Sequence, residues 1–284
     1  MQFWVLAISS ALLYGVWKFG LSAFRGTVSA YAAILISAST ALLVYLVVGS
    51  ARNVLDFNVH DVPAGLLGGA LNFTGTLLIF KAFTRGKVGV AVGVGALNIL
   101  VPLSYALLRG ERPDVHVAFG VALLLAGLCV FYAPNVRTKD PDDAAGSRTT
   151  ILLALGAALA WGLAIIVLDV GAQPDVVTST LAVSQIPQIA IATIVLIAAS
   201  RHSIRGVSRT AFAALAGSGA ALGVANMAFF TAANEGSLGI VSVLTSASPL
   251  VTAVLAAVFL AERLTNSDRV AFALVIVGSA LVVV

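Results

Sequence analysis

The chain is poor in charged residues, cysteine and histidine. Only 10% of its 284 residues are charged, against about 25% in a soluble domain. The single Cys129 lies in an apolar run, which excludes a disulfide framework. Three histidines fall in or near loops, and no HExxH motif, CxxC pair or phosphate-binding P-loop occurs. We therefore expect no catalytic residue, no metal site and no cofactor.

Apolar residues dominate instead. They make up 60% of the chain, and the mean hydropathy is +1.05. The net charge is +4, but the basic residues lie between apolar runs, which favours a role in membrane topology over binding to nucleic acid. The first run, Phe3–Phe24, lacks the basic flank of a signal peptide, so we expect it to be retained as a span.

The apolar runs are long enough, at roughly 17–25 residues, to cross a bilayer as helices. They are continuously apolar rather than alternating, which favours helices over a barrel. The sequence thus predicts an all-α membrane protein with ten transmembrane helices: Phe3–Phe24, Thr27–Val48, Val62–Phe83, Val88–Leu108, Val115–Ala133, Thr149–Val170, Val176–Ala199, Thr210–Ala233, Leu238–Leu260 and Val270–Val284.

The second half of the chain repeats the first. Phe80–Val90 is matched by Phe230–Ile240 at an offset of 150 residues, and the upstream Tyr14-Gly15 pair is matched by Trp161-Gly162 at an offset of 147. We predict a five-helix repeat in residues 1–133, a polar linker in residues 134–148 and a second repeat in residues 149–284. Because five is odd, the second repeat enters from the opposite side, as in transporters built from inverted repeats.

These motifs resemble the EamA branch of the drug/metabolite transporter superfamily. That family carries a Trp-Gly pair in its first span, and in its fourth helix a proline followed 13 residues later by a Gly-Glu-Arg-type ending. Here Pro249 precedes Glu262-Arg263 at that spacing, while the first repeat has Asn98 where the proline should be. The run Lys81–Val90 is similar to the family's turn between the third and fourth helices.

The resemblance implies a secondary transporter with a central polar cavity lined by spans 1, 3, 4, 6, 8 and 9, and with spans 5 and 10 outside it. It also implies cytoplasmic termini. The basic residues argue the other way, since eleven lie on the side opposite the termini and three on their side. Both orientations stay open.

Lys18 is a charged residue well inside the first span, where a charge costs about 2.5–3.5 kcal/mol on insertion scales. Either it binds substrate or it snorkels toward Arg25, about 10 Å away at 1.5 Å per residue. Lys81 is two residues from the end of its span, so snorkelling is favoured there, with assistance to substrate nearer the mouth as the alternative.

Amides inside spans normally face other helices or a water-filled cavity. We favour bonding between helices for Gln185 and Gln188, and the cavity for Asn72, Asn98 and Asn226. The remaining candidate substrate contacts are two aromatic residues and a hydroxylated segment around a helix-breaking proline: Trp17, Trp161, Thr245, Ser246 and Pro249.

The sequence therefore predicts a secondary transporter, with export as the favoured direction. It would move a small polar metabolite, anionic or zwitterionic, across the plasma membrane of a prokaryotic cell by alternating access. The partners expected are this substrate and the lipid bilayer; the oligomeric state is left open. The alternatives are a membrane-embedded enzyme, for which a nucleophile–base or metal set is missing from the sequence, and a structural membrane protein.

Overall fold

The computed structural model describes residues 3–24, 27–55, 57, 62–85, 91, 94–112, 114–136, 142–198, 207–259 and 266–283. Every element in this part of the chain is helical. The elements are α1 Phe3–Ala23, α2 Ala30–Arg52, α3 Val62–Arg85, η1 Ala96–Ile99, α5 Leu100–Leu108, α6 Val115–Val136, α7 Asp142–Gly171, α8 Val177–Ala198, α9 Arg209–Glu235, α10 Leu238–Thr245, α11 Ser248–Phe259 and α12 Asn266–Val283.

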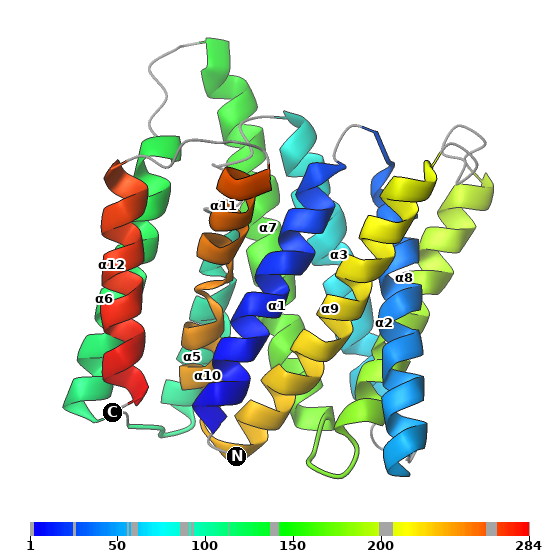
Figure 1. Ribbon diagram of the computed structural model, residues 1–284, viewed down its shortest axis with the longest axis horizontal. Coiled ribbons are helices and arrows are strands. Elements are labelled where there is room, and N and C mark those ends of the chain that lie inside the picture. The colour runs from blue at the N-terminus through cyan, green and yellow to red at the C-terminus, as the bar shows by residue number, and fades with distance from the viewer. Residues whose placement is uncertain are drawn as a thin grey trace.

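Seven of the described helical segments are long and apolar enough to cross a membrane, with α10 and α11 counted as one segment. Three shorter apolar helices lie where the fourth, fifth and tenth spans are expected: Ala96–Leu108, Val115–Gly127 and Arg269–Val282. The ten-span count stays a prediction. The two ends of the chain lie at the same end of the bundle, as Figure 1 shows.

Helix starts and stops follow local side-chain chemistry. Ser29, Ser208 and Ser237 precede α2, α9 and α10, and each hydroxyl accepts a bond from a backbone N–H of the first turn. Asn53 ends α2 in the left-handed conformation, with φ of 54°. Such caps satisfy polar groups that the apolar interior of a membrane cannot.

The helices of the two halves interlock rather than forming separate bundles. α1 packs along α9, while α7 packs along α3. α2 contacts α8 and α9, while α8 contacts α2 and α3. α1 contacts α10 and α11, while α7 contacts η1 and α5, and α6 pairs with α12 at one side of the bundle (Figure 1). Exchanging each of these helices with its counterpart in the other half returns the contacts named here.

Two helix crossings depend on glycine. A Cβ built on Gly69 of α3 would stand 2.0 Å from the carbonyl oxygen of Ser184 in α8, and one built on Gly219 of α9 would stand 2.5 Å from that of Ser37 in α2. Gly219 follows Gly69 by 150 residues, and Ser184 follows Ser37 by 147. Small residues let backbones approach this closely in a membrane bundle.

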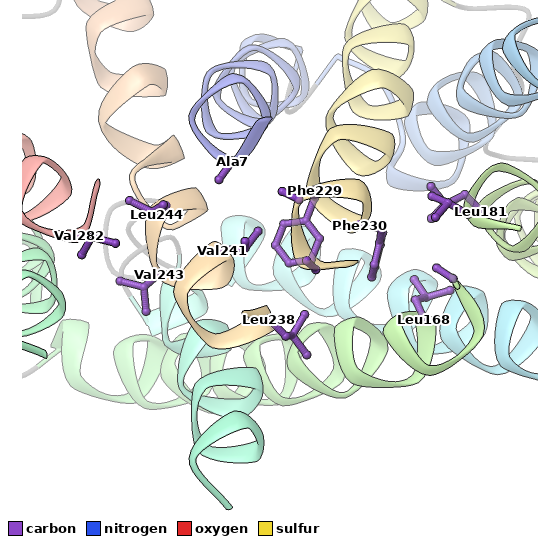
Figure 2. Packing of buried hydrophobic residues seen from close by; sticks show 14 of the residues in the cluster. Ala7, Leu168, Leu181, Phe229, Phe230, Leu238, Val241, Val243, Leu244 and Val282 are labelled. Carbon is purple, nitrogen blue, oxygen red and sulfur yellow. The ribbon is translucent and has the colours of Figure 1, made fainter. Parts of the chain in front are cut away.

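The largest apolar cluster of the described residues joins α1, α2 and every helix from α6 to α12. Figure 2 shows Phe229 and Phe230 of α9 at its centre, with Val241 and Leu238 of α10 beside them. The two phenyl rings meet edge to face, with centroids 5.0 Å apart. This cluster fixes α10 against the bundle and so positions the polar residues that follow it.

The structure corrects three boundaries. The fourth and ninth spans, expected as continuous helices over Val88–Leu108 and Leu238–Leu260, are interrupted. The first of them passes through the 3₁₀ turn η1 before α5, and the second divides into α10 and α11. The polar stretch 134–148 is shorter as a linker than expected, because α6 runs to Val136 and α7 already begins at Asp142. Residues 137–141 lie outside the described part.

Candidate functional site

The interruption between α10 and α11 concentrates polar groups inside the bundle. Pro249 has no N–H, so the carbonyl of Thr245 lacks its helical donor. Across the gap the backbone makes hydrogen bonds between residues three apart. The N–H of Ala247 donates to the carbonyl of Leu244 at 3.2 Å, and the N–H of Leu250 donates to the carbonyl of Ala247 at 3.0 Å. Thr245, Ser246 and Pro249 are buried here.

Lys18 reaches this interruption from α1. Its Nζ donates a hydrogen bond of 2.8 Å to the Oγ of Ser248, the first residue of α11, which is only 2% exposed. Beside it, the hydroxyl of Thr252 donates to the carbonyl of Gly15 at 3.0 Å, which ties α11 to α1. The ammonium therefore points into the packed interior instead of climbing toward Arg25, a residue outside the described part.

The environment of this ammonium contains little negative charge. α1, α10 and α11 contain no Asp or Glu, and the only acid of α9 is Glu235, its last residue. A helix N-terminus carries partial positive charge. The ammonium of Lys18 and the start of α11 thus present positive charge to the same place, an arrangement that favours a bound anion.

Asn226 of α9 links three helices through hydrogen bonds. The hydroxyl of Tyr14 in α1 donates to its Oδ1, and its Nδ2 donates to the hydroxyl of Tyr45 in α2 at 2.9 Å. Asn226 is 8% exposed and Tyr45 is fully buried. The sequence placed Asn226 on a cavity wall, whereas the structure shows its amide engaged in a hydrogen-bonded network between α1, α2 and α9.

The other half holds a similar contact at matching positions. The Nε1 of Trp161 in α7 is 3.4 Å from the Oγ1 of Thr76 in α3, and that hydroxyl donates to the carbonyl of Asn72 at 2.9 Å. Asn98 lies in η1, where a Cβ on Gly162 would stand 2.8 Å from its carbonyl oxygen. Asn72, Asn98 and Trp161 are all half-buried.

Trp17 lies next to Lys18 with its ring against Tyr14. The centroids are 6.4 Å apart in an edge-to-face arrangement, and the residue is 8% exposed. Its Nε1 has no hydrogen-bond partner among the described residues. Lys81, in contrast, is exposed on the last part of α3, so the structure does not bury the two lysines together.

The two glutamines bond mainly within their own helix. The Nε2 of Gln188 donates to the Oε1 of Gln185 at 3.1 Å, and the Nε2 of Gln185 donates to the Oγ of Ser184 at 2.9 Å. The bonding between helices favoured from the sequence is thus replaced by an intrahelical chain beside Pro187. Both amides are buried, at 1% and 4% exposure, in the helix that packs on α2 and α3.

Sequence reasoning missed Tyr45 and the role of the Tyr14 hydroxyl. A phenol in the middle of an apolar run is the signal that could have found them, because a buried O–H needs a partner. In the structure Glu111 accepts a hydrogen bond from the hydroxyl of Ser237, the N-cap of α10, so it links two elements.

Comparison with known proteins agrees with this architecture. A solved crystal structure of another protein superposes with a TM-score of 0.79 over 98% of this chain and 95% of its own, at 20% sequence identity. That likeness shows a shared fold. No curated protein sequence matches the chain.

The second half of the chain provides the family assignment. Residues 148–284 match the EamA-like transporter family. Together with several apolar helices of spanning length, this match indicates a multi-pass membrane transporter. This half is thus similar to the EamA-like transporter family, within the drug/metabolite transporter superfamily that the motifs of the chain resemble.

Proposed function

We propose that this protein is a secondary transporter that exports a small polar metabolite carrying a carboxylate, either anionic or zwitterionic, across the plasma membrane. The observation that carries the proposal is the position of Lys18, whose ammonium meets Ser248 at the start of α11 on helices without acidic residues. Lys18 would bind the carboxylate.

Electrostatics supports this role. An unpaired ammonium is costly in a membrane interior, at about 2.5–3.5 kcal/mol on insertion scales. One neutral hydroxyl, that of Ser248, does not neutralise it. An anion at the same place would gain from the ammonium and from the dipole of α11 together. The site is therefore incomplete without a negatively charged group.

Alternating access is supported by the exchange pattern of the helix contacts and by the two interrupted helices. α1 against α10 and α11 mirrors α7 against η1 and α5, and α10 itself contacts α5 and η1. We propose two inverted repeats, residues 1–133 and 149–284, that rock about this centre. Interrupted helices at the repeat interface are the usual binding elements of such transporters.

The other candidate residues would surround the substrate at different levels. Thr245, Ser246 and Pro249 lie at the interruption that Lys18 reaches from α1, and Trp17 precedes Lys18 on that helix. Asn72, Asn98 and Trp161 would form the opposite wall of a polar cavity, and Asn226 would hold α1, α2 and α9 together behind it. Lys81, exposed on α3, would assist nearer the mouth.

Reconstituted protein in liposomes tests the role of Lys18. Liposomes that contain purified wild type or Lys18→Gln would be loaded with a mixture of labelled metabolites from an expressing cell. The efflux of carboxylates from them is then measured. The wild type should release at least one carboxylate, and Lys18→Gln should reduce that release at least tenfold, since each lost 1.4 kcal/mol of binding is a factor of ten.

Lys81→Gln is the matched control, because it removes the same charge from an exposed position. It should reduce efflux less than Lys18→Gln does. Thermal unfolding in detergent verifies that both variants fold. Unchanged efflux in a well-folded Lys18→Gln protein would refute carboxylate binding by Lys18, and absence of flux for every metabolite would refute transport.

A further inference from the structure

Four buried polar atoms of α1 and α10 have no hydrogen-bond partner in the described part of the chain. They are the hydroxyls of Ser10, Ser242 and Thr245 and the indole N–H of Trp17. These residues are at most 8% exposed. Leaving a buried donor or acceptor unpaired costs about 1–3 kcal/mol each. Two of these groups lie on α1 and two on α10, helices that contact each other, and no group of the described residues satisfies them.

The hydroxyls of α10 and α11 form one row that ends at Lys18. Ser242, Thr245 and Ser248 are spaced by three residues, and the chain between the last two makes bonds of the i to i+3 type. In such a 3₁₀ segment, side chains three residues apart lie on the same line. The rise per residue places Thr245 about 6 Å and Ser242 about 10 Å from Ser248 along the axis.

A second row of polar side chains lies on α1 and runs parallel to the row on α10 and α11. Ser10, Tyr14 and Lys18 are spaced by four residues and share one side of the helix. Tyr14 bonds α9 and Lys18 bonds α11, so this side faces the space between those helices, where Ser10 lies about 12 Å below Lys18.

Two close contacts set the register between the rows. Gly15 packs on Ser248, and Gly236 packs on Phe3. Both pairs are 233 residues apart, so α1 and the segment of α10 and α11 run in parallel at the same height. Ser10 is therefore level with Ser242, and the two unpaired hydroxyls fall at the far end of the same pair of rows.

We infer that these rows form a second subsite that takes the hydroxyl groups of a polyhydroxylated carboxylate, a sugar acid or its open-chain form. The inference rests on the proposed function, since the carboxylate of that ligand binds Lys18. Its hydroxyls, up to about 10 Å along the rows, bond Thr245, Ser242 and Ser10. The indole N–H of Trp17, which can only donate, receives an acceptor oxygen from it.

The chemistry of the rows selects against other small acids. An amino acid would bring an ammonium, for which α1, α10 and α11 offer no carboxylate, and an ammonium offers Trp17 no acceptor. An aliphatic acid would leave all four polar atoms unpaired. A hydroxyl both donates and accepts, so a chain of hydroxyls satisfies serine, threonine and tryptophan alike.

The test uses labelled gluconate and glucuronate as probes, with the purified protein in liposomes. Hexanoate, which has the carboxylate without hydroxyls, and sorbitol, which has hydroxyls without the carboxylate, serve as competitors of similar size. We expect uptake of at least one probe, competition by hexanoate at least tenfold weaker than by the unlabelled probe, and no competition by sorbitol. Failure of both probes to enter overturns the inference.

Thr245→Val and Ser242→Ala remove hydroxyls from the row. Each should raise the half-saturation concentration of the probe about threefold to tenfold, as expected for one lost hydrogen bond, and leave inhibition by hexanoate unchanged. Because each removes an unpaired group, the melting temperature of the empty protein should stay the same or rise. Thr40→Val, whose hydroxyl donates to the carbonyl of Ile36 at 2.9 Å on α2, is the control and should leave the half-saturation unchanged.

The outcomes separate the two proposals. If hexanoate competes as well as the unlabelled probe and the hydroxyl variants change nothing, but Lys18→Gln still abolishes carboxylate transport, the subsite is refuted and the proposed function stands. If Thr245→Val lowers the melting temperature and weakens the probe and hexanoate equally, Thr245 acts in folding and the subsite is likewise refuted. If Lys18→Gln also leaves carboxylate transport intact, both proposals fail.

Discussion

Gly219→Ala tests the close crossing of α2 and α9 that holds the first and second halves together. An alanine Cβ at this position would lie 2.5 Å from the carbonyl oxygen of Ser37 and 2.6 Å from its Cα. Ordinary contacts begin at 3.4 Å, so the two helices must separate by about 1 Å, and both obstructing atoms are backbone. Overpacking of this kind costs about 1–3 kcal/mol.

Gly217→Ala supplies the reference on the same helix. A Cβ at Gly217 meets nothing within 4 Å. Both variants gain the same preference of alanine over glycine for a helix, about 1 kcal/mol. The difference in stability between the two variants therefore isolates the steric cost at Gly219. One kcal/mol corresponds to about 2–4 °C for a chain of 150–250 residues, so Gly219→Ala should melt about 2–12 °C below Gly217→Ala.

Thermal unfolding of the two purified variants in the same detergent measures this difference. Gly69→Ala should behave like Gly219→Ala, because its Cβ would stand 2.0 Å from the carbonyl oxygen of Ser184 in the matching crossing of α3 and α8. If Gly219→Ala melts at or above Gly217→Ala, the two backbones do not approach as closely as described, and the reasoning from this crossing is wrong.

Three further variants test other contacts by the same thermal unfolding. Tyr45→Phe removes the acceptor of the buried Asn226 amide and should cost about 1–3 kcal/mol; equal stability would show that the network adds nothing. Ser237→Ala removes both the cap of α10 and the donor to Glu111, so it should destabilise more than Ser29→Ala, which removes a cap alone. Gly110→Ala forces φ of 92° on a residue with a Cβ and should cost about 1–2 kcal/mol, although no atom lies within 4 Å of that Cβ.

The helices could be predicted from the sequence because membrane spans are read from local composition. α1, expected over Phe3–Phe24, is found over Phe3–Ala23, and α3 begins at Val62 as expected. The hydrocarbon core requires a continuous apolar run with its own backbone bonds satisfied. No partner elsewhere in the chain is needed to recognise such a run, so the boundaries follow from charged and turn-forming residues.

The interruptions inside the spans were less visible. Pro249 indicated one of them, since it removes a backbone donor, and the structure places the gap immediately before it at Ser246 and Ala247. In the first half Gly162 contacts Asn98 as Gly15 contacts Ser248, which puts Ile99 and no proline at the place that matches Pro249, yet the chain still tightens into η1. Tertiary contacts, such as that of Gly162 with the carbonyl of Asn98, accompany this 3₁₀ turn. The local sequence pattern alone predicts an ordinary α-helix there.

The polar contacts could not be predicted because their partners are remote in the chain. Lys18 and Ser248 are 230 residues apart, and Tyr45 and Asn226 are 181 apart. Composition identifies a lysine or an amide that needs a partner in a membrane, but only the crossing of α1 with α11, or of α2 with α9, supplies it. The sequence therefore listed Lys18 and Asn226 as candidates without showing what each of them meets.

The matching positions of the two halves locate the place where the substrate would be recognised. Tyr14 with Asn226 corresponds to Trp161 with Thr76, and both pairs are hydrogen-bonded between helices. The correspondence between the two halves ends one helical turn further along α1, at Lys18. Lys18 with Ser248 is matched by Ile165 with Asn98, so the charge exists in one half alone.

Duplicated structure explains a residue that occurs twice, since both copies serve the same packing. The buried ammonium of Lys18 occurs once, and an isoleucine at this position, as in the other half, would avoid its cost. Packing of the shared fold therefore does not explain Lys18, and another use is required. Binding of an anionic group from the substrate is such a use, which is why Lys18→Gln discriminates more sharply than a change at any of the repeated positions.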